Sequence, residues 1–323
     1  MSWIRMAYIV AACGSFGAAA AGAQEYPNRP VRLVVPFPAG GGSDTAARSL
    51  APRLGQRLKQ QIVVDNRPGA AGAIGAEFAS RAAPDGYTLL LGSTSELTLY
   101  PALASKPPYD VLRDFVPIAL VSDIAFMLVV HPSLPVHSVQ DLVSLAKKKP
   151  GQIHYGSAGH GATSHLTLAL LCDMTGIDLT HVPYKGTPPA AADLLGGHLQ
   201  ALMPPLPSVL PYTQNGRLRA LAVSSAKRWP TVPDVPTVAE SGLPGYEMVL
   251  WTGVLAPANT PAEIVNRLHR EIAQVLEQPE VVQTFGKLGA IVRLLGPAEF
   301  DAYLKQELAR WAQVGKRTGI RIN

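Results

Sequence analysis

Residues 31–44 read VRLVVPFPAGGGSD, in which a short β-branched strand runs into a glycine-rich loop. The residues that follow predict a helix with an apolar face formed by Ala47, Leu50, Ala51, Leu54 and Leu58. Ser43 or Asp44 can cap the first turn of this helix. A strand, a glycine-rich loop and a helix in this order are typical of a βα unit, whose helix N-terminus favours an anion. This stretch therefore predicts both a fold class and a place for a ligand.

The alternation of strands and helices continues to the end of the chain. Further strands are expected at residues 62–64, 88–91, 127–130, 153–155, 180–183, 199–203, 218–224 and 291–294. Further helices are expected at residues 70–81, 138–149, 163–175, 190–195, 260–278 and 297–316. The TPAE sequence at residues 260–263 resembles a capping box that opens the helix after it. Strands that alternate with helices of this size predict βαβ units and a largely parallel sheet.

Length and composition favour a folded protein with two domains. The 323 residues are 47% hydrophobic and 16% charged, which excludes a largely disordered chain. The formal net charge is +5, and the basic residues are scattered rather than clustered with aromatic residues. We therefore expect no binding of nucleic acid.

Residues 1–23 have the pattern of a secretory signal peptide. Arg5 precedes an uncharged run that ends in Ala21-Gly22-Ala23, a small-x-small cleavage site. We expect cleavage after Ala23 and a periplasmic location for the mature chain. Val10-Ala11-Ala12-Cys13 also resembles a lipobox, so a lipoprotein anchored at Cys13 stays an alternative.

Two glycine-rich loops are the strongest candidates for a binding site. Residues 39–44 and 156–163 each follow a predicted strand and lead into a predicted helix, where backbone amides and the helix dipole favour an anion. Their hydroxyl donors are Ser43, Ser157, Thr163 and Ser164. A third hydroxyl-rich segment, residues 92–95, also ends a predicted strand. Because ligands of open α/β sheets lie at the carboxyl ends of strands, loops in separate halves of the chain suggest two lobes around one solute.

Motifs of enzymes and metal sites are absent from the sequence. No G-x-S-x-G, H-E-x-x-H or Walker A pattern occurs. His154, His160 and His165 share no helical face, and no Cys or carboxylate stands among them, so we expect loop and surface histidines, no metal and no cofactor. The GAAGAIG run at residues 69–75 has the wrong spacing for a dinucleotide fingerprint and favours a closely packed helix.

Six segments carry a resemblance to a known family. They are PVRLVVPFPAGGGSD (30–44), VDNRPGAAG (64–72), PDGYTLL (84–90), HVPYKG (181–186), LRALAVSS (218–225) and PDVPTVAESGLPG (233–245). These segments resemble the Bug family of extracytoplasmic solute-binding proteins, which is associated with tripartite tricarboxylate transporters. The resemblance runs from about Tyr26 to the C-terminus.

The resemblance implies a two-lobed α/β fold like that of type II periplasmic binding proteins. Each lobe is expected to be a mixed, mostly parallel sheet flanked by helices, with the ligand cleft between the lobes. The implied first lobe comprises residues 25–122 and 226–323, and the implied second lobe comprises residues 123–225. Strands near residues 119–125 and 222–226 are expected to connect them.

The resemblance also implies a ligand and a binding surface. Family members bind carboxylates and related small metabolites, largely through backbone amides, hydroxyls and bridging waters. The residues expected to bind the ligand are Phe37, Pro38, Ala39, Gly40, Gly41, Ser43, Ser93, Thr94, Ser157, Gly159, Gly161, Ala162, Thr163 and Pro204.

The chain departs from the family pattern at two places. Met203-Pro204-Pro205 stands where many relatives carry Phe-Asp-Asn, so a carboxylate that often faces the cleft is missing. Glu96 stands where relatives tend to have small neutral residues. We expect Glu96 to point outward into solvent; the alternative is that it points inward and receives a cation.

The leading interpretation is a monomeric receptor that closes two lobes around a small carboxylate or related metabolite and does no chemistry on it. A membrane permease or sensor is its candidate partner. A secreted hydrolase is one alternative, although the sequence contains no recognisable pair of nucleophile and base. A lipid-anchored ligand sensor is another.

Overall fold

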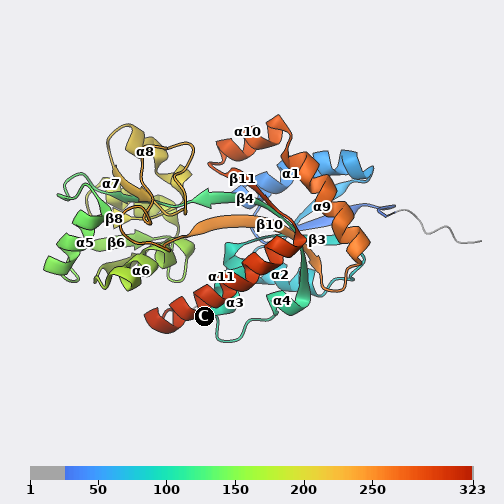
Figure 1. Cartoon of the computed structure of the whole chain (residues 1–323), viewed down its shortest axis with the longest axis horizontal. Coiled ribbons are helices and arrows are strands. Elements are labelled where there is room, and N and C mark those ends of the chain that lie inside the picture. Colours follow the sequence, from blue (N-terminus) through green and yellow to red (C-terminus); the bar gives the residue numbers. More distant parts are fainter. Residues whose placement is uncertain (1–25, 322–323) are drawn as a thin grey trace, which may run out of the picture.

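Two β-sheets divide the molecule into two lobes that lie along its long axis (Figure 1). The computed structural model describes residues 26–321, so the predicted signal peptide and Cys13 lie outside the described residues. Within residues 26–321, no helix combines the length and apolarity needed to cross a bilayer. We call the six-stranded sheet with its helices the first lobe, and the five-stranded sheet with its helices the second lobe.

The elements alternate along the chain much as the sequence predicts. The strands are β1 (Val31–Val35), β2 (Ile62–Asn66), β3 (Thr88–Ser93), β4 (Phe115–Ala125), β5 (Met127–Val130), β6 (His154–Ser157), β7 (Thr180–Pro183), β8 (Ala201–Leu202), β9 (Arg219–Val223), β10 (Val249–Pro257) and β11 (Ile291–Leu295). The helices are α1 (Gly42–Leu58), α2 (Ala73–Ser80), α3 (Tyr100–Leu103), α4 (Val111–Asp114), α5 (Val139–Lys148), α6 (Thr163–Thr175), α7 (Thr187–Leu195), α8 (Leu210–Gln214), α9 (Ala262–Leu276), α10 (Pro279–Lys287) and α11 (Pro297–Thr318). Short helical turns are η1 (Ala70–Gly72), the π-helical η2 (Ser95–Leu99) and η3 (Leu206–Ser208).

The sheet of the first lobe has the order β11-β4-β10-β3-β1-β2 and is covered by helices on both faces. Alternate residues of β1 point to opposite faces, because successive side chains of a strand do so. Leu33 packs with α1 and α9, whereas Val34 packs with α2 and α11. Burial on both faces explains why β1 is a nearly continuous apolar run.

The sheet of the second lobe has the order β7-β6-β8-β5-β9. One face packs against α5 and α6 through residues such as Leu142 and Leu166. The other face packs against α7 through Ala190 and Leu194. The two lobes are therefore separate three-layer units, as the resemblance implied.

The expected excess of parallel pairing is wrong, although both sheets are mixed. Parallel neighbours are β1–β2, β1–β3, β6–β7 and β6–β8, and the other five neighbouring pairs are antiparallel. The difference arises from β4 and β10, long strands that the apolar pattern did not predict. They pair antiparallel with each other because one leaves the first lobe and the other returns to it.

Two predicted helix caps are also wrong. Helix α1 already begins at Gly42, with Gly41 as its N-cap, so Ser43 and Asp44 both lie inside its first turn. The Asp44 carboxylate instead accepts hydrogen bonds from the Gly40 amide at 2.8 Å and from Asn66 Nδ2 at 3.0 Å. The Thr260 hydroxyl donates to the Pro257 carbonyl at 2.7 Å and so closes the turn after β10 rather than capping α9.

The chain crosses between the lobes twice, and the crossings are hydrogen-bonded to each other. The first crossing joins β4 to β5 at Phe126, and the second leads from β9 through Ser224 to β10. The Ser224 hydroxyl accepts from the Phe126 amide at 2.8 Å and donates to the Met248 carbonyl. The lobe boundaries predicted from the resemblance, at residues 122–123 and 225–226, stay a prediction.

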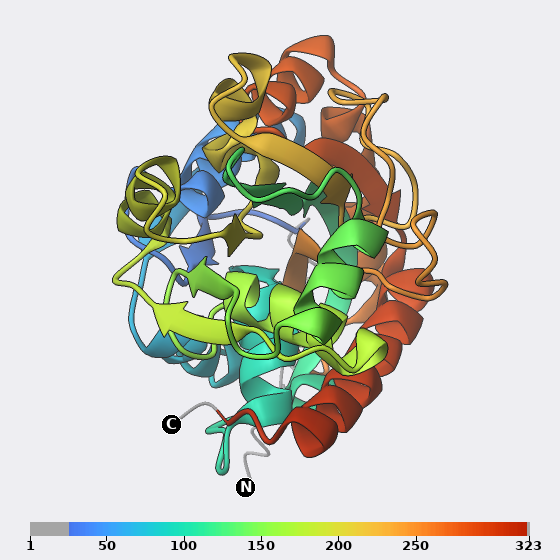
Figure 2. The same ribbon diagram turned by 90° about the vertical axis from the view of Figure 1, so that its left-hand side faces the viewer.

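Helix α11 is a third connection between the lobes (Figures 1 and 2). Phe300 and Leu304, near its start, belong to a core of the first lobe. Trp311 and Val314, near its end, are buried among residues of the second lobe. Arg317 also forms an ion pair with Asp173 of α6 at 2.8 Å. One continuous helix therefore contributes to the cores of both lobes.

Candidate ligand-binding cavity

A cavity of about 350 Å³ lies at the carboxyl ends of β1 and β3, where Thr163 at the start of α6 also reaches it. Its lining residues are Phe37, Pro38, Gly41, Gly42, Ser43, Ala46, Ser93, Ser95, Ser122, Ile124, Thr163, Leu250, Thr252, Phe285, Leu288 and Ala290. This volume is within the range of small-molecule sites, and the ends of parallel strands are where such sites occur in α/β proteins.

Hydroxyl groups line up across three neighbouring strands on one side of the cavity. Ser93 of β3 is paired with Thr252 of β10, and Thr252 is paired with Ser122 of β4. The Ser122 and Thr252 hydroxyls are 2.6 Å apart and share one hydrogen bond. Neither Ser122 nor Thr252 was predicted from the sequence. The available signal was that polar residues interrupt apolar runs, as in LVSDI (120–124) and LWTGV (250–254).

The N-terminus of α1 supplies free backbone donors. The amides of Gly40 and Gly41 donate to Asp44 Oδ2 and to the Pro38 carbonyl, so they are already used. The amides of Gly42 and Ser43 have no acceptor among the described residues, and both residues line the cavity. Unpaired amides in the first turn of a 17-residue helix form a site for an anion.

Asp44 lies beside these amides, yet its charge is offset. Its carboxylate accepts from Arg48 Nε at 2.9 Å in addition to Gly40 and Asn66. The hydrogen bond from Arg48, together with those from Gly40 and Asn66, lowers the pKa of Asp44 to about 2. Asp44 is therefore ionised and paired, and it leaves Gly42 and Ser43 available to a ligand.

The rest of the cavity wall is apolar. Its larger side chains are Phe37, Ile124, Leu250, Phe285 and Leu288. None of the lining residues is charged, so neither an arginine clamp nor an acidic partner for an amine faces the ligand. The site suits a molecule with an anionic group at the amide and hydroxyl end and an uncharged body along the apolar wall.

The cavity brings together only part of the predicted binding set. Its lining includes Phe37, Pro38, Gly41, Ser43, Ser93 and Thr163. It does not include Ala39, Gly40, Thr94, Ser157, Gly159, Gly161, Ala162 or Pro204. The assignment of either group to ligand binding stays a prediction, but the positions of the second group have clear structural reasons.

Thr94 and Pro204 have structural partners. The Thr94 hydroxyl donates to the Val249 carbonyl at 3.2 Å and accepts from the Trp251 amide at 2.9 Å. It therefore attaches the end of β3 to β10. Pro204 is buried, and its carbonyl accepts from the Met127 amide at 3.0 Å.

The loop before α6 uses most of its polar groups internally. The Ser157 hydroxyl accepts from the Gly159 amide at 3.1 Å, and the Ala158 amide donates to Ser164 Oγ at 2.9 Å. The Gly161 amide donates to His165 Nδ1 at 3.1 Å. The amides of His160, Thr163 and Ser164 remain without an acceptor among the described residues, whereas the His165 amide donates to the Ala162 carbonyl at 2.9 Å.

Glu96 does not point into solvent, so that expectation is wrong. Its side chain is fully buried in η2, directly after the hydroxyl-rich end of β3. The Ser93 amide donates to Glu96 Oε1 at 2.5 Å, and Ser93 Oγ lies 2.7 Å from Oε2. The inward alternative therefore describes its position, and the binding of a cation by Glu96 stays a prediction. No lysine or arginine of residues 26–321 forms an ion pair with it.

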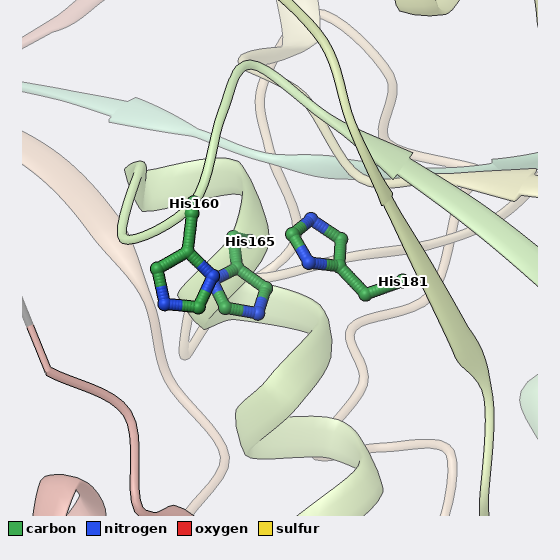
Figure 3. A group of neighbouring side chains, drawn as sticks. All are labelled: His160, His165 and His181. Atoms are coloured by element: carbon green, nitrogen blue, oxygen red, sulfur yellow. The ribbon is translucent and has the colours of Figure 1, made fainter.

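Three histidines gather beside the loop before α6 (Figure 3). One ring nitrogen from each of His160, His165 and His181 lies within 4.8 Å of the others. His165 is buried, so the expectation of loop and surface histidines is wrong for this residue. The sequence analysis also missed His181, which β7 brings to the cluster, while His154 lies outside it.

The arrangement of these rings does not favour a metal ion. His165 and His181 stack with their centroids 3.9 Å apart and their planes at 9°. Ring lone pairs lie in the ring plane, so stacked rings direct them side by side rather than toward one ion. Burial and the neighbouring imidazoles lower the pKa of His165 to about 3 and that of His181 to about 4, which keeps both rings neutral.

Ser157 and His181 form a pair that the sequence did not reveal. Ser157 Oγ lies 2.7 Å from His181 Nε2, a geometry shared by nucleophile and base in hydrolases. Ser157 is fully buried, however, and its hydroxyl also donates to the Gly159 carbonyl at 2.9 Å. These contacts favour a role in holding the loop.

Comparisons with known proteins agree with this architecture. Residues 46–320 match the model of the tripartite tricarboxylate transporter family receptor. Protein BugT of Bordetella pertussis is 39% identical over 306 residues, which cover 94% of each chain. The structure of R. palustris Rpa4515 with adipate has a TM-score of 0.77 at 38% identity and covers 92% of this chain and 99% of that one. MatC from Rhodopseudomonas palustris, with bound malate, has a TM-score of 0.73 at 33% identity and covers 90% and 99%.

Proposed function

Because the chain belongs to the tripartite tricarboxylate transporter receptor family, which includes the Bug proteins, we propose that it captures a small carboxylate in the cavity between α1, β3, β10 and β4. The members compared above are binding proteins. The pattern of residues 1–23 supports export to the periplasm, with a membrane permease as the partner that receives the ligand.

One observation carries the proposal for an anionic ligand. The unpaired amides of Gly42 and Ser43 and the hydroxyls of Ser93, Ser122 and Thr252 line a single cavity that contains no acidic side chain. Such donors replace the water molecules that a carboxylate loses on binding. A cation would find neither a carboxylate nor a helix C-terminus there.

The apolar wall supports a narrower ligand class. A short ligand whose groups are mostly polar, such as malate, would place its carboxylates and its hydroxyl group against Phe37, Leu250 and Phe285. An aliphatic chain, as in adipate, gains free energy from the same contacts, about 25 cal/mol for each Å² of apolar surface removed from water. We therefore propose a carboxylate with an apolar body of four or more carbons as the ligand class, by analogy with the adipate-bound relative.

Thermal unfolding with and without ligand tests this proposal. Adipate at 100 times its dissociation constant is expected to stabilise the protein by about 2.7 kcal/mol, malate less, and the neutral adipamide not at all. Equal effects of adipate and adipamide would contradict an anion site.

Ser43→Asp tests the role of the α1 N-terminus. Adipate affinity is expected to fall about tenfold or more, since like charges 4 Å apart repel by about 1 kcal/mol in bulk water and more in a cavity. Thr45→Asp is the matched control, because it adds the same charge to the first turn of α1 but does not line the cavity. An equal loss of affinity in both variants would show that α1 does not hold the carboxylate.

A hydrolase is the second candidate, favoured only by the Ser157–His181 pair. Burial of Ser157 argues against it, because a substrate carbonyl cannot reach the hydroxyl without opening of the loop. Hydrolysis of activated esters by the purified protein, abolished by Ser157→Ala, would replace the receptor proposal with this one. We expect no turnover.

A further inference from the structure

The buried carboxyl of Glu96 lies directly behind the cavity. Ser93 lines the cavity and contacts Glu96 with both its amide and its hydroxyl. The Tyr109 hydroxyl donates to the backbone carbonyl of Glu96 at 2.5 Å and so holds the turn in place. Short π-helical turns such as η2 are rare and are frequent at functional sites.

Glycines make the room that Glu96 occupies. A Cβ atom at Gly72 would lie 3.0 Å from Glu96 Oε2, and one at Gly92 would lie 3.4 Å from Oε1. Gly72 also has φ of +96°, which a residue with a side chain rarely adopts. Backbone therefore approaches the carboxyl from two sides, which leaves it no contact with water.

Burial without a cation favours the acid form of this group. Desolvation raises the pKa of Glu96 to about 8, and the hydrogen bonds from Ser93 oppose this only in part. The elements packed against η2 also carry titratable groups. They are Glu77 on α2, Tyr100 on α3, Tyr109 after it, and Glu299, Asp301, Tyr303, Lys305, Glu307, Arg310, Lys316 and Arg317 on α11. None of them is among the causes of the raised pKa of Glu96.

The protonation state of Glu96 decides what Ser93 offers to the cavity. The Ser93 amide donates to Oε1, so a proton on the carboxyl resides on Oε2 and is donated to Ser93 Oγ. The Ser93 hydroxyl hydrogen is then free to be donated to a ligand oxygen. Once Glu96 is ionised, the Ser93 hydroxyl must donate to it instead. Ser93 then presents only an oxygen lone pair to the cavity, and the negative charge of Glu96 lies behind it.

We propose that Glu96 is a positioning residue whose proton sets the direction of the Ser93 hydroxyl, so that carboxylate binding requires the acid form of Glu96. The inference rests on the proposed function, because it assumes an anionic group next to Ser93. Below pH 7, Glu96 is already protonated, so binding of the carboxylate takes up no proton from solvent. Above pH 8, binding takes up one proton from solvent onto Glu96, and the apparent affinity decreases accordingly.

Glu96→Gln is the decisive variant. The glutamine side chain keeps the acceptor for the Ser93 amide and donates an N–H to Ser93 Oγ, so it imitates the acid form at every pH. Adipate affinity of the native protein is expected to fall up to about thirtyfold from pH 6.5 to pH 9.5, with the decrease beginning near pH 8 and approaching about tenfold per pH unit above it. The Glu96→Gln protein should keep its affinity over this range. Parallel decreases in both proteins would overturn the inference.

Glu307→Gln provides the matched control. Glu307 of α11 is also a buried glutamate whose pKa is raised by desolvation, but its hydrogen-bond partners, Arg310 and Trp311, do not line the cavity. Its variant should retain the alkaline decrease of the native protein. If Glu307→Gln abolishes the decrease and Glu96→Gln does not, ionisation of Glu307 rather than Glu96 causes the loss of affinity, and the inference is overturned.

An infrared measurement without ligand separates this inference from the proposed function. The C=O band of a buried protonated carboxylic acid should be present at pH 7, disappear with a midpoint near pH 8 and be missing in Glu96→Gln. Absence of this band at pH 7 overturns the inference whatever the ligand. If neither the native protein nor Glu96→Gln binds adipate at pH 6.5, the proposed function is contradicted instead. The C=O band then still shows whether Glu96 is protonated.

Discussion

At the scale of single residues, the site depends on side chains whose partners lie far away in the sequence. Ser122 and Thr252 are 130 positions apart, and they share a hydrogen bond only because β4 and β10 are neighbours. Glu96 is buried because Gly72 and Gly92 leave space for it. Local sequence predicted Ser43 and Ser93, which follow or end a strand, but it contained no information on these distant contacts.

The histidine cluster should make the protein sensitive to acid. The pKa of His165 is about 3 in the folded protein and about 6.5 when unfolded, so the unfolded chain binds more protons between these values. The stability associated with neutral His165 is fully present above pH 6.5 and is lost as the pH falls through this window. The melting temperature should therefore decrease from pH 7.5 to pH 5, and less so in His165→Gln.

His154→Gln is the control for this prediction. His154 is exposed and lies outside the cluster, so its variant should follow the native pH profile in differential scanning calorimetry. An unchanged pH slope in His165→Gln would mean that another group causes the loss of stability in acid.

At the scale of elements, apolar periodicity was a good guide to α5 and α6 and to the short strands. The predicted range 163–175 coincides with α6, and Ser138 caps α5 through the Asp141 amide at 3.0 Å. Periodicity missed β4 and β10 because polar residues and Pro117 interrupt their apolar runs. Those interruptions include the hydroxyls of the cavity, so the same residues that obscured the strands form part of the site.

Helix α11 should contribute strongly to stability through its last turns. Trp311 is fully buried among residues of the second lobe, and Trp311→Ala should lower the free energy of unfolding by about 3–5 kcal/mol. Gln306→Ala on the exposed side of the same helix should change it by less than about 0.5 kcal/mol. Urea denaturation measures both. Equal effects would show that α11 rests loosely on the second lobe.

At the scale of the whole molecule, the cavity is assembled mainly from the first lobe. Thr163 is the one lining residue contributed by the second lobe, whose loop of residues 157–162 stays outside the cavity. Thr163 already reaches the cavity, and closure of the lobes would bring the free amides of Thr163 and Ser164 nearer to a ligand. We expect the crossings at Phe126 and Ser224 to act as the hinge for this movement.

Ligand-induced closure can be measured by small-angle X-ray scattering. Saturating adipate should decrease the radius of gyration of the native protein, because the lobes then enclose the cavity. Ser43→Asp, which should bind adipate poorly, is expected to keep the larger radius at the same concentration. Thermal stabilisation by adipate with no change in radius would mean that the ligand is held by the first lobe alone.

The uncharged lining of the cavity affects how strongly ligand affinity depends on the salt concentration around the protein. Receptors that bind anions through lysine or arginine lose affinity as the salt concentration rises, because dissolved ions screen those charges. Here the donors are fixed backbone amides and hydroxyls that can contact the ligand at hydrogen-bond distance, where no dissolved ion fits between them. The affinity for a carboxylate should therefore decrease only weakly as the salt concentration rises.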